Sequence, residues 1–590
     1  MMVLDWLVRV SMATGALTAS GGHQATAPGW AIAGSGTVVS LDGPDDRPPD
    51  GGHAIDRVLD AVMRRGDDGL SRLRGQFALA ISGPPGHPAR VLRDPLGSHP
   101  LFYTRCGDEV LFAARPQTLL AQPGGSRALN RAAIADHLSK RWPLRQETFF
   151  EVIHRVPPGW QVVVSPTGVS AARYWNPVDP SGHIAFLADD EVERFDTLLE
   201  LATARAFTGT RAGIFLSGGF DSVSVAAVAH DVAAARGARQ AAALSIAFPA
   251  LECNEEHVQA SVAERLGLPL HLIDFDSAVG TTGLLEGGIA LNRTLGAPLF
   301  NTWMPAYLTL LDTAVAEDVD TILTGEGGDE WLGTTPFLAA DLWRRGDLPG
   351  LVALARTWKR SFRQDWATVA RSVTWKYGLR PLAGQVCHRV APEAWDARRA
   401  AKAVASTPPF IARDAGLHRT LLDRARLSLA AASPAGGFYA REAAVFLDHP
   451  LMSWLFEEQF AVGAPRGIRY VHPYWDPDLV AHMYRVSPAR LNEGARTKAL
   501  VRQTVDRRFP SLGFRRQRKI TATQFFADLV RREGPPLAAA VSDFDGLASL
   551  GIVEPAAART FLTQAWGGSP RSVGMAWTLV NMEYWVRGHA

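Results

Sequence analysis

Cysteine is scarce in this sequence. Its 590 residues include 3 cysteines, Cys106, Cys253 and Cys387, which are widely spaced and follow no metal-ligand pattern. Such scattered thiols exclude a disulfide framework and a cysteine zinc site, and they favour a reducing compartment. Lysine is also scarce, because only six of the 61 basic residues are lysines. A lysine within a recognisable motif is therefore a candidate for a specific role.

The sequence has neither an excess of one charge nor a long apolar run. Its 61 basic and 59 acidic residues give a net charge of +2, which gives no electrostatic reason to expect nucleic acid or a membrane surface as the main partner. No window reaches the roughly 18 uninterrupted apolar residues that a membrane span needs. Near the N-terminus Asp5 and Arg9 interrupt the apolar part, which argues against a secretory signal. We therefore expect a cytoplasmic protein.

The length of the chain predicts more than one domain, because 590 residues are too many for one hydrophobic core. Residues 50–175 contain short apolar runs bounded by Gly, Pro and Asp, which are typical of strands. The segment 176–191 is rich in Pro, Asp and Gly and is a plausible linker. We predict one domain over residues 1–185 and a second over residues 186–590.

Strands and helices alternate in the first part of the predicted second domain. Apolar runs such as AGIFLSGG and AAALSIAF predict strands, and the Ala-rich segment between them predicts a helix that ends at Gly237. This alternation is typical of an α/β fold with a parallel sheet covered by helices on both faces. Ligands of such sheets bind beyond the carboxyl ends of the strands. Beyond about residue 340 the sequence predicts mainly helix.

The segment IFLSGGFDS, residues 214–222, ends one predicted strand and begins a helix. We expect Gly218 and Gly219 to take positive φ angles and to let a ligand approach the backbone. Backbone N–H groups at the start of a helix bind anions, and Ser217 and Ser222 add hydroxyl donors, so the segment predicts a pyrophosphate site. It lacks the spacing of a kinase-type phosphate loop or of a dinucleotide fingerprint. The alternative is an ordinary strand-to-helix turn capped by Asp221.

A second loop, TGEGGDE at residues 324–330, also ends a predicted strand. It contains Glu326, Asp329 and Glu330 among three glycines. Several carboxylates beside a phosphate site need a cation, and Mg²⁺ held by one or two carboxylates together with phosphate oxygens meets that need. We predict Asp221 and Asp329 as the metal ligands.

The pair of segments LSGGFDS and LTGEGGDE resembles the synthetase domain of the asparagine synthetase B family, whose fold is of the adenine-nucleotide hydrolase type. These ligases cleave ATP to AMP and pyrophosphate. The resemblance implies that ATP and its pyrophosphate contact residues of both loops and of one intervening strand: Leu216, Ser217, Gly218, Gly219, Asp221, Ser222, Leu244, Ser245, Ile246, Thr324 and Gly325. Residues 244–247 would line the adenine site, and Glu326 matches the glutamate linked in the family to forming an acyl-adenylate.

Blocks in the last third of the chain extend this resemblance. VHPYWDPDLV, TKALVR and FRRQRK are similar to three family blocks, and the last two contain Lys498 and Lys519. By this resemblance Lys519 is the catalytic lysine and Lys498 binds the nucleotide. A compact ammonium acts as a point charge beside phosphate or a developing oxyanion, which a planar guanidinium replaces poorly. The alternative is that both are surface lysines.

The first domain is similar to the glutaminase half of the same family, through LRGQFALAI, LRDPLGSHPLFY and RVPPGWQV. The resemblance implies an Ntn-type α+β sandwich. In glutamine-using members a cysteine at the start of the mature chain attacks the glutamine amide. The sequence given begins Met1, Met2, Val3, so we expect no release of ammonia from glutamine and a first domain that serves as a scaffold.

Two branches of the family join an amine that the substrate itself carries: the β-lactam synthetases and the macrolactam synthetases (cyclases) of lasso peptides. Glu326 departs from the β-lactam branch, which has tyrosine there, but a gapless comparison anchored on HPYWD places Glu457 at that branch's catalytic glutamate. We name Glu457 as the candidate base. The alternative is that Glu457 and Glu458 belong to a solvated helix face.

The overall resemblance is closest to the lasso cyclases. It implies that an Asp or Glu side chain of a precursor (core) peptide is adenylated and joined to the peptide's N-terminal amine. A leader-binding protein and a leader peptidase are expected partners. Three alternatives stay open: a β-lactam-type or other small-molecule amide ligase, an ammonia-dependent asparagine synthetase, and a degenerate scaffold without activity.

Overall fold

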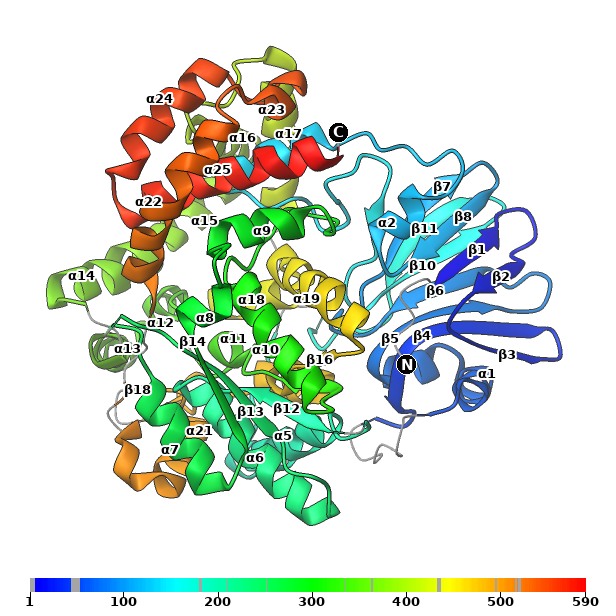
Figure 1. Cartoon of the computed structure of the whole chain (residues 1–590), viewed down its shortest axis with the longest axis horizontal. Coiled ribbons are helices and arrows are strands. Elements are labelled where there is room, and N and C mark those ends of the chain that lie inside the picture. The colour runs from blue at the N-terminus through cyan, green and yellow to red at the C-terminus, as the bar shows by residue number, and fades with distance from the viewer. Residues whose placement is uncertain are drawn as a thin grey trace.

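Two antiparallel sheets face each other in the first part of the chain, at the right of Figure 1. One has the strand order β2-β1-β8-β7-β9 and the other β11-β10-β6-β5-β4-β3. Alternate apolar side chains, such as Val8 and Val10 of one sheet and Ala78 and Ala80 of the other, meet between them. Helix α1 (Ile55–Arg72) covers the outer face of the six-stranded sheet. The α+β sandwich predicted for this domain is confirmed.

The computed structural model describes most of the chain: residues 6–43, 53–179, 183–209, 211–250, 252–333, 335–361, 364–431, 437–493, 496–514, 517 and 521–589. The strands of the sandwich are β1 (Leu7–Ser11), β2 (Leu17–Ser20), β3 (His23–Ala27), β4 (Trp30–Ser40), β5 (Arg74–Ser82), β6 (Ala89–Arg93), β7 (Phe102–Cys106), β8 (Glu109–Ala113), β9 (His154–Arg155), β10 (Trp160–Ser165) and β11 (Gly168–Arg173). Strands β1 to β4 lie before the region in which the sequence pattern predicted strands.

A parallel sheet of order β14-β13-β12-β15-β16 forms the second domain's centre. Its strands are β12 (Ala212–Phe215), β13 (Ala242–Ala247), β14 (Leu270–Asp274), β15 (Thr321–Leu323) and β16 (Arg469–Val471). Helices α5 (Arg194–Ala204), α6 (Phe220–Arg236) and α7 (Glu256–Leu266) pack on one face, and α10 (Met304–Ala316) packs on the other. Helix α6 ends at Gly237, whose φ is 62°. The predicted α/β fold is confirmed.

Strand β12 lies between β13 and β15, so the order of the strands reverses there. The loops that follow β12 and β15 therefore leave neighbouring strands at the same edge of the sheet, the edge where open parallel sheets bind ligands.

The rest of the second domain is mainly helical, as predicted, and forms much of the upper left of Figure 1. Its elements are α8 (Phe275–Val279), α9 (Leu284–Asn292), α11 (Gly328–Trp331), α12 (Leu338–Arg345), α13 (Leu348–Ser361), α14 (Trp366–Arg371), the π-helix η1 (Ser372–Leu379), α15 (Arg380–Val390), α16 (Pro392–Ala405), α17 (Ala415–Ala431), α18 (Phe438–Asp448), α19 (Pro450–Gly463), η2 (Ala464–Arg466), η3 (Pro473–Trp475), α20 (Pro477–Tyr484), β17 (Asn492–Glu493), β18 (Arg496–Thr497), α21 (Ala499–Arg508), η4 (Pro510–Leu512), α22 (Thr523–Ala540), α23 (Asp545–Ser549), α24 (Pro555–Trp566) and α25 (Pro570–His589).

Short helices complete the chain: α2 (Pro116–Leu120), α3 (Arg131–Leu138) and α4 (Asp189–Val192). Between β11 and α4, the described residues 174–179 and 183–188 form neither helix nor strand, within or beside the predicted linker. None of the helices that the structure describes has the length and apolar character needed to cross a membrane.

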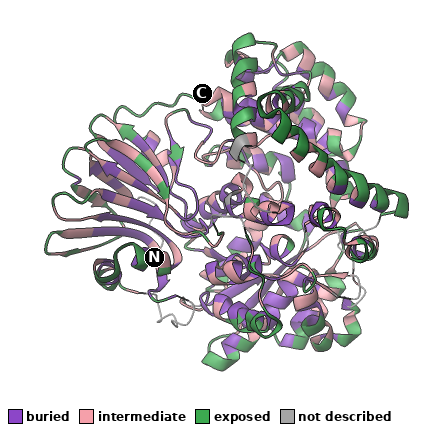
Figure 2. Cartoon of the chain, turned by 180° about the vertical axis from the view of Figure 1, so that it is seen from behind, coloured by how far each residue is buried: buried purple, intermediate pink, exposed green. Residues whose placement is uncertain are grey.

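The two domains share a continuous apolar core, which is coloured as buried in Figure 2. The C-terminal helix α25 contributes Trp585, whose ring centroid lies 5.6 Å from that of Phe149 and 5.7 Å from that of Phe150. These two phenylalanines belong to the first domain, so the end of the chain fastens the sandwich to the second domain.

Polar side chains of the sandwich also reach across the domain boundary. Arg74 pairs with Asp478 at the start of α20 at 2.8 Å, and both side chains are largely buried. Gln76 Nε2 donates to the carbonyl of Tyr470 in β16 at 2.6 Å. A strand of the parallel sheet is thus held partly by the first domain, which gives the sandwich a structural role.

Candidate functional site

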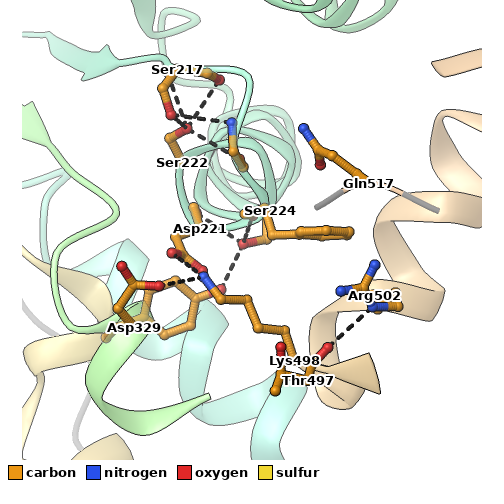
Figure 3. A network of polar contacts seen from close by, with 12 residues as sticks. Ser217, Asp221, Ser222, Ser224, Asp329, Thr497, Lys498, Arg502 and Gln517 are labelled. Carbon is orange, nitrogen blue, oxygen red and sulfur yellow. Dashed lines mark hydrogen bonds and ion pairs between the residues drawn. The ribbon is translucent and has the colours of Figure 1, made fainter. Parts of the chain in front are cut away.

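The loop between β12 and α6 is tied together by two serine hydroxyls (Figure 3). Ser217 Oγ lies 2.8 Å from Ser222 Oγ, and the backbone N–H of Ser217 donates to the same Ser222 oxygen at 3.1 Å. The N–H of Gly219 donates to Ser217 Oγ at 3.2 Å. The N–H groups of Ser217 and Gly219 are therefore satisfied by hydroxyl groups of the loop itself at the start of α6.

The glycines of this loop are needed for space and not for an unusual backbone angle. Gly219 has φ −80°, and neither it nor Gly218 is among the glycines with positive φ, so that expectation was wrong. A Cβ atom at Gly218 would lie 2.8 Å from Glu255 Cβ. The N–H of Gly218 donates to Glu255 Oε2 at 3.1 Å. A carboxylate oxygen thus occupies a position suited to a phosphate oxygen.

The second loop packs directly against the first. A Cβ atom at Gly325 would lie 2.7 Å from the backbone nitrogen of Ser222, and one at Gly328 would lie 2.3 Å from Asp221 Cγ. Side chains at these two positions would push the loops apart. Gly327, between them, has φ +96°, which is readily accessible only to glycine. The expectation that the two glycine-bearing loops converge is confirmed.

Lys498 lies between the carboxylates of the two loops (Figure 3). Its Nζ donates to Asp221 Oδ2 at 2.6 Å and to Asp329 Oδ1 at 2.9 Å. Burial by itself would lower the pKa of Lys498, but the charges of Asp221 and Asp329 offset it and the pKa is raised. The lysine therefore stays protonated.

The backbone of Lys498 is in the left-handed region, with φ 65°, immediately before α21. Its N–H donates to the carbonyl of Leu332 at 3.1 Å. Such a conformation is uncommon for a lysine and is kept where the surrounding structure over-determines it. The strain fixes the direction from which the ammonium enters the site.

The Lys498 ammonium balances only one of the two negative charges of Asp221 and Asp329. The remaining negative charge favours binding of a further cation. Because Asp221 and Asp329 both reach the same Nζ atom, their oxygens are close enough to face one ion. No cluster of three or more potential metal ligands occurs among the described residues. The donor set therefore fits a hard divalent ion that takes most of its ligands from phosphate and water.

A cavity of about 550 Å³ opens from these loops. Ser217, Asp221, Asp329 and Lys498 lie at one side of it, and residues of α18 and η1 form another wall. Its volume is in the usual range for small-molecule sites. The cavity extends from the two loops to α18 and η1.

Glu326 follows Thr324 on the second loop, and its N–H donates to Thr324 Oγ1 at 3.2 Å. The residue is exposed to solvent, although protein atoms crowd around its carboxylate. Burial, with the charges of Glu330 and Asp329 added, raises the pKa of Glu326 to about 7. Burial, with the charges of Glu326 and Glu255 added, raises the pKa of Tyr307 to about 12. Glu326 therefore lies near the same tyrosine as Glu255, which lines the cavity.

Thr324 is itself fixed from the neighbouring strand. Its hydroxyl lies 2.7 Å from Nδ1 of His472, the residue after β16. Burial lowers the pKa of His472 to about 3, so the ring is neutral, and it stacks on Phe456 at 4.5 Å. The loop that carries Glu326 is therefore anchored through an uncharged contact.

The residues predicted for the adenine site are buried within the sheet. Leu244, Ser245 and Ile246 of β13 are at most 5% exposed, and Ser245 Oγ donates to the carbonyl of Leu216. None of them lines the large cavity. Their contact with adenine stays a prediction, and Ala247 at the end of the strand is the partly exposed residue.

Glu457 does not lie at the phosphate-binding loops. Its carboxylate forms two hydrogen bonds with Arg155, at 2.6 and 2.8 Å, and one with Arg93 at 3.2 Å. Both arginines belong to the first domain, and Glu457 does not line the large cavity. The expectation of a base at this position is corrected to an ion pair of the domain interface.

The alternative of a solvated helix face is also wrong for these glutamates. The Glu457 side chain is 10% exposed, and Glu458 is 3% exposed. Glu458 accepts hydrogen bonds from the N–H groups of Phe300 and Asn301 at 2.6 and 3.1 Å. Burial raises the pKa of Glu458 to about 8.

The predicted catalytic Lys519 lies outside the described residues. Gln517 of the same block is described, and its Nε2 donates to the carbonyl of Gly218 at 2.7 Å. Gln517 therefore lies beside the loop that follows β12.

Sequence reasoning missed three further residues of the site: Glu255, Arg502 and Gln517. Arg502 lies 4.2 Å over the ring of Phe220 and donates to the carbonyls of Thr497 and Phe514. Arg502 belongs to the TKALVR block, so its place four residues after Lys498 was an available signal.

Comparisons with known proteins agree with the two-part architecture. A family model described as asparagine synthase matches residues 194–587, and one described as a glutamine amidotransferase domain matches residues 55–175. The amidase chyE of Penicillium rubens is 26% identical over 300 residues, which cover 47% of this chain and 42% of that protein. Asparagine synthetase (glutamine-hydrolyzing) 3 of Bacillus subtilis is 25% identical over 335 residues, which cover 52% of this chain and 53% of that protein.

The chain thus spans about half of the length of the curated relatives it matches, or less. Among solved structures, a glutamine phosphoribosylpyrophosphate amidotransferase of B. subtilis is 13% identical, with 45% of this chain and 58% of that chain covered and a TM-score of 0.18. A likeness at this level carries no information about function.

The geometry of Lys498 gives the first testable prediction. Lys498→Ala should weaken ATP binding by about 10- to 100-fold, because it removes a charge-assisted donor and leaves two carboxylates facing the phosphates. Isothermal titration calorimetry with ATP and magnesium measures this. Lys402→Ala, which removes an exposed ammonium of α16, is the matched control and should bind ATP as the unaltered protein does. Equal affinity of the Lys498 and Lys402 variants would contradict the assignment.

Proposed function

The chain belongs to the asparagine synthase family, and from this we propose that it is an ATP-dependent, AMP-forming ligase that joins a carboxyl group to an amine. The observation that carries the proposal is the meeting of two loops from adjacent parallel strands around Lys498, at the mouth of one cavity. The loops offer backbone donors and an ammonium to a polyphosphate, and the cavity leaves space for an acceptor.

In the first step an oxygen of the substrate carboxylate attacks the α-phosphorus of ATP. The bond from that phosphorus to the bridging oxygen breaks, and pyrophosphate leaves. We assign the binding of the leaving group to the ammonium of Lys498 and to the loop at Ser217–Gly219. The N–H groups of this loop would exchange their present partners, which are the hydroxyls of Ser217 and Ser222 and the carboxylate of Glu255, for phosphate oxygens. A magnesium ion held by Asp221 and Asp329 would supply additional positive charge to the polyphosphate when bound.

In the second step the amine attacks the acyl carbon of the adenylate, the amide bond forms and AMP leaves. We assign the acceptance of the amine proton to Glu326, whose pKa is raised to about 7. An α-amine titrates at about 7.7 to 8.0, so a base of this strength is sufficient near neutral pH. Lys519 keeps its proposed role at the developing oxyanion by family resemblance.

We propose further that both reacting groups belong to one peptide. An internal Asp or Glu side chain would be adenylated and joined to the peptide's own N-terminal amine, which closes a macrolactam ring as in lasso peptides. The sequence blocks around Lys498 and the extent of the cavity beyond the phosphate loops support this choice. A leader-binding protein and a leader peptidase are the proposed partners.

Product analysis tests the proposal. We expect a synthetic peptide with a free N-terminus and one internal Asp or Glu to yield AMP, pyrophosphate and a product that has lost one water. The N-acetylated peptide is the control: it should support ATP–pyrophosphate exchange but give no cyclic product. Formation of ADP and orthophosphate would contradict the ligase. Exchange with a free amino acid, or asparagine from aspartate and ammonium, would support the alternatives to the peptide substrate.

The pH dependence distinguishes the two glutamates considered as the base. As the pH rises through about 7, Glu326 loses its proton and becomes competent, so kcat/KM should rise there. Glu326→Gln should lower kcat by about 100-fold or more and remove the rise of kcat/KM near pH 7, which is the Glu326 limb of the pH–rate profile. The second rise, at about pH 7.7 to 8.0, comes from deprotonation of the amine itself and should stay. Steady-state pyrophosphate release against pH measures both.

Glu457→Gln is the matched control for that experiment. It should keep the limb near pH 7 and most of the rate. It should lower the melting temperature, because Arg155 and Arg93 lose a buried negative partner. Loss of the limb in the Glu457 variant, with the Glu326 variant unchanged, would reverse the assignment.

A further inference from the structure

A carboxylate that the proposed reaction does not use lies in the wall of the large cavity. Glu442, on α18, lines the same cavity as Ser217 and Lys498. Within the described part of the chain it makes no hydrogen bond and no ion pair. Its neighbour Arg441 has its guanidinium 5.3 Å over the ring of Phe438. Burial raises the pKa of Glu442, and the charge of Arg441 offsets only part of that effect, so the carboxylate is partly desolvated and has no cation in direct contact.

Aromatic side chains surround this part of the cavity. Phe337, Tyr377 and Phe446 line it together with Glu442. The rings of Phe337 and Tyr377 are 5.2 Å apart with their planes at 80°, and Trp358 supports Tyr377 from behind in the same edge-on manner at 5.7 Å. The Tyr377 ring already accepts one cation, because the Lys376 ammonium lies 4.7 Å from its centroid. The wall is thus mainly aromatic, and aromatic faces attract cations.

The π-helix η1 fixes the position of Tyr377. A Cβ atom at Gly378 would lie 2.4 Å from the carbonyl oxygen of Val373 and 2.5 Å from Trp343 Cδ1. Trp343 Nε1 donates to that same carbonyl at 3.2 Å. The π-helical turn is therefore held by a glycine and by a tryptophan. Such turns are rare and occur frequently at functional sites.

We propose that Glu442, with Tyr377, Phe337 and Phe446, forms the subsite that binds the ammonium-bearing end of the second substrate. A partly desolvated carboxylate regains favourable interactions when a cation arrives, and aromatic faces add cation–π attraction. A primary ammonium on a hydrocarbon stem satisfies both groups. The inference rests on the proposed function for the role of that ammonium, which becomes the attacking amine after it loses its proton. It makes Glu442 a residue of substrate specificity, distinct from the nucleotide-binding loops.

Binding of small probes to the whole chain tests the subsite without any reaction. Phenethylammonium chloride and phenylpropanol have similar shapes, and only the first is charged. By saturation-transfer NMR and calorimetry we expect the ammonium to bind about tenfold more tightly than the alcohol. Glu442→Gln should abolish this preference, and Tyr377→Leu should weaken both probes. Glu393→Gln removes an exposed carboxylate of α16 and is the matched control, with the preference unchanged.

Equal affinity for the two probes, no measurable binding of the ammonium, or a preference that survives Glu442→Gln would overturn the subsite. These results would leave the ligase proposal standing, since they involve no nucleotide. Formation of ADP in the product assay would overturn the ligase and leave the probe result intact. With an active enzyme, Glu442→Gln should raise the KM for the amine-bearing peptide about tenfold and leave the KM for ATP unchanged.

Discussion

The forced approach of two carboxylates is the constraint on which the site depends. Asp221 and Asp329 come from different strands, yet glycines at 325 and 328 bring their loops into contact, and Lys498 bridges the two side chains. Two like charges at this distance repel strongly where water is partly excluded. The arrangement is stable only with positive charge between them, from the lysine and from a metal ion in a nucleotide complex. The same charge is what a polyphosphate needs.

The rest of the fold holds these groups in register. Strand β12 and its neighbour β15 place the two loops at one edge of the sheet, and β16 supports them from the side. Gln76 of the first domain binds β16, His472 follows that strand and contacts Thr324, and Thr324 accepts a hydrogen bond from the N–H of Glu326. The sandwich domain therefore contributes to the geometry of the site through a chain of short polar contacts, and the Glu457–arginine pairs add to the same interface.

Local patterns predicted the parallel sheet and both loops, because strand ends, glycines and acidic residues are encoded within a few consecutive positions. Lys498 was identified since lysine is rare in this sequence and stands in a recognisable block. Glu457 was misassigned because its partners, Arg93 and Arg155, lie about 300 or more residues away and belong to another domain. The positions of Glu255 and Glu442 likewise depend on tertiary packing, and no spacing rule reveals a π-helical turn such as η1. The prediction of positive φ angles at Gly218 and Gly219 was wrong, because lack of space for a side chain, and not backbone conformation, requires glycine there.

A structure of the protein with a non-cleavable α,β-methylene analogue of ATP and magnesium tests the central claim most directly. The account predicts that the triphosphate lies between the loop at Ser217–Ser222 and the loop at Thr324–Glu330. One of its phosphate oxygens should lie within hydrogen-bond distance of Lys498 Nζ, and the metal should contact Asp221 and Asp329. A triphosphate bound elsewhere, with the lysine still closed on both carboxylates, would contradict it.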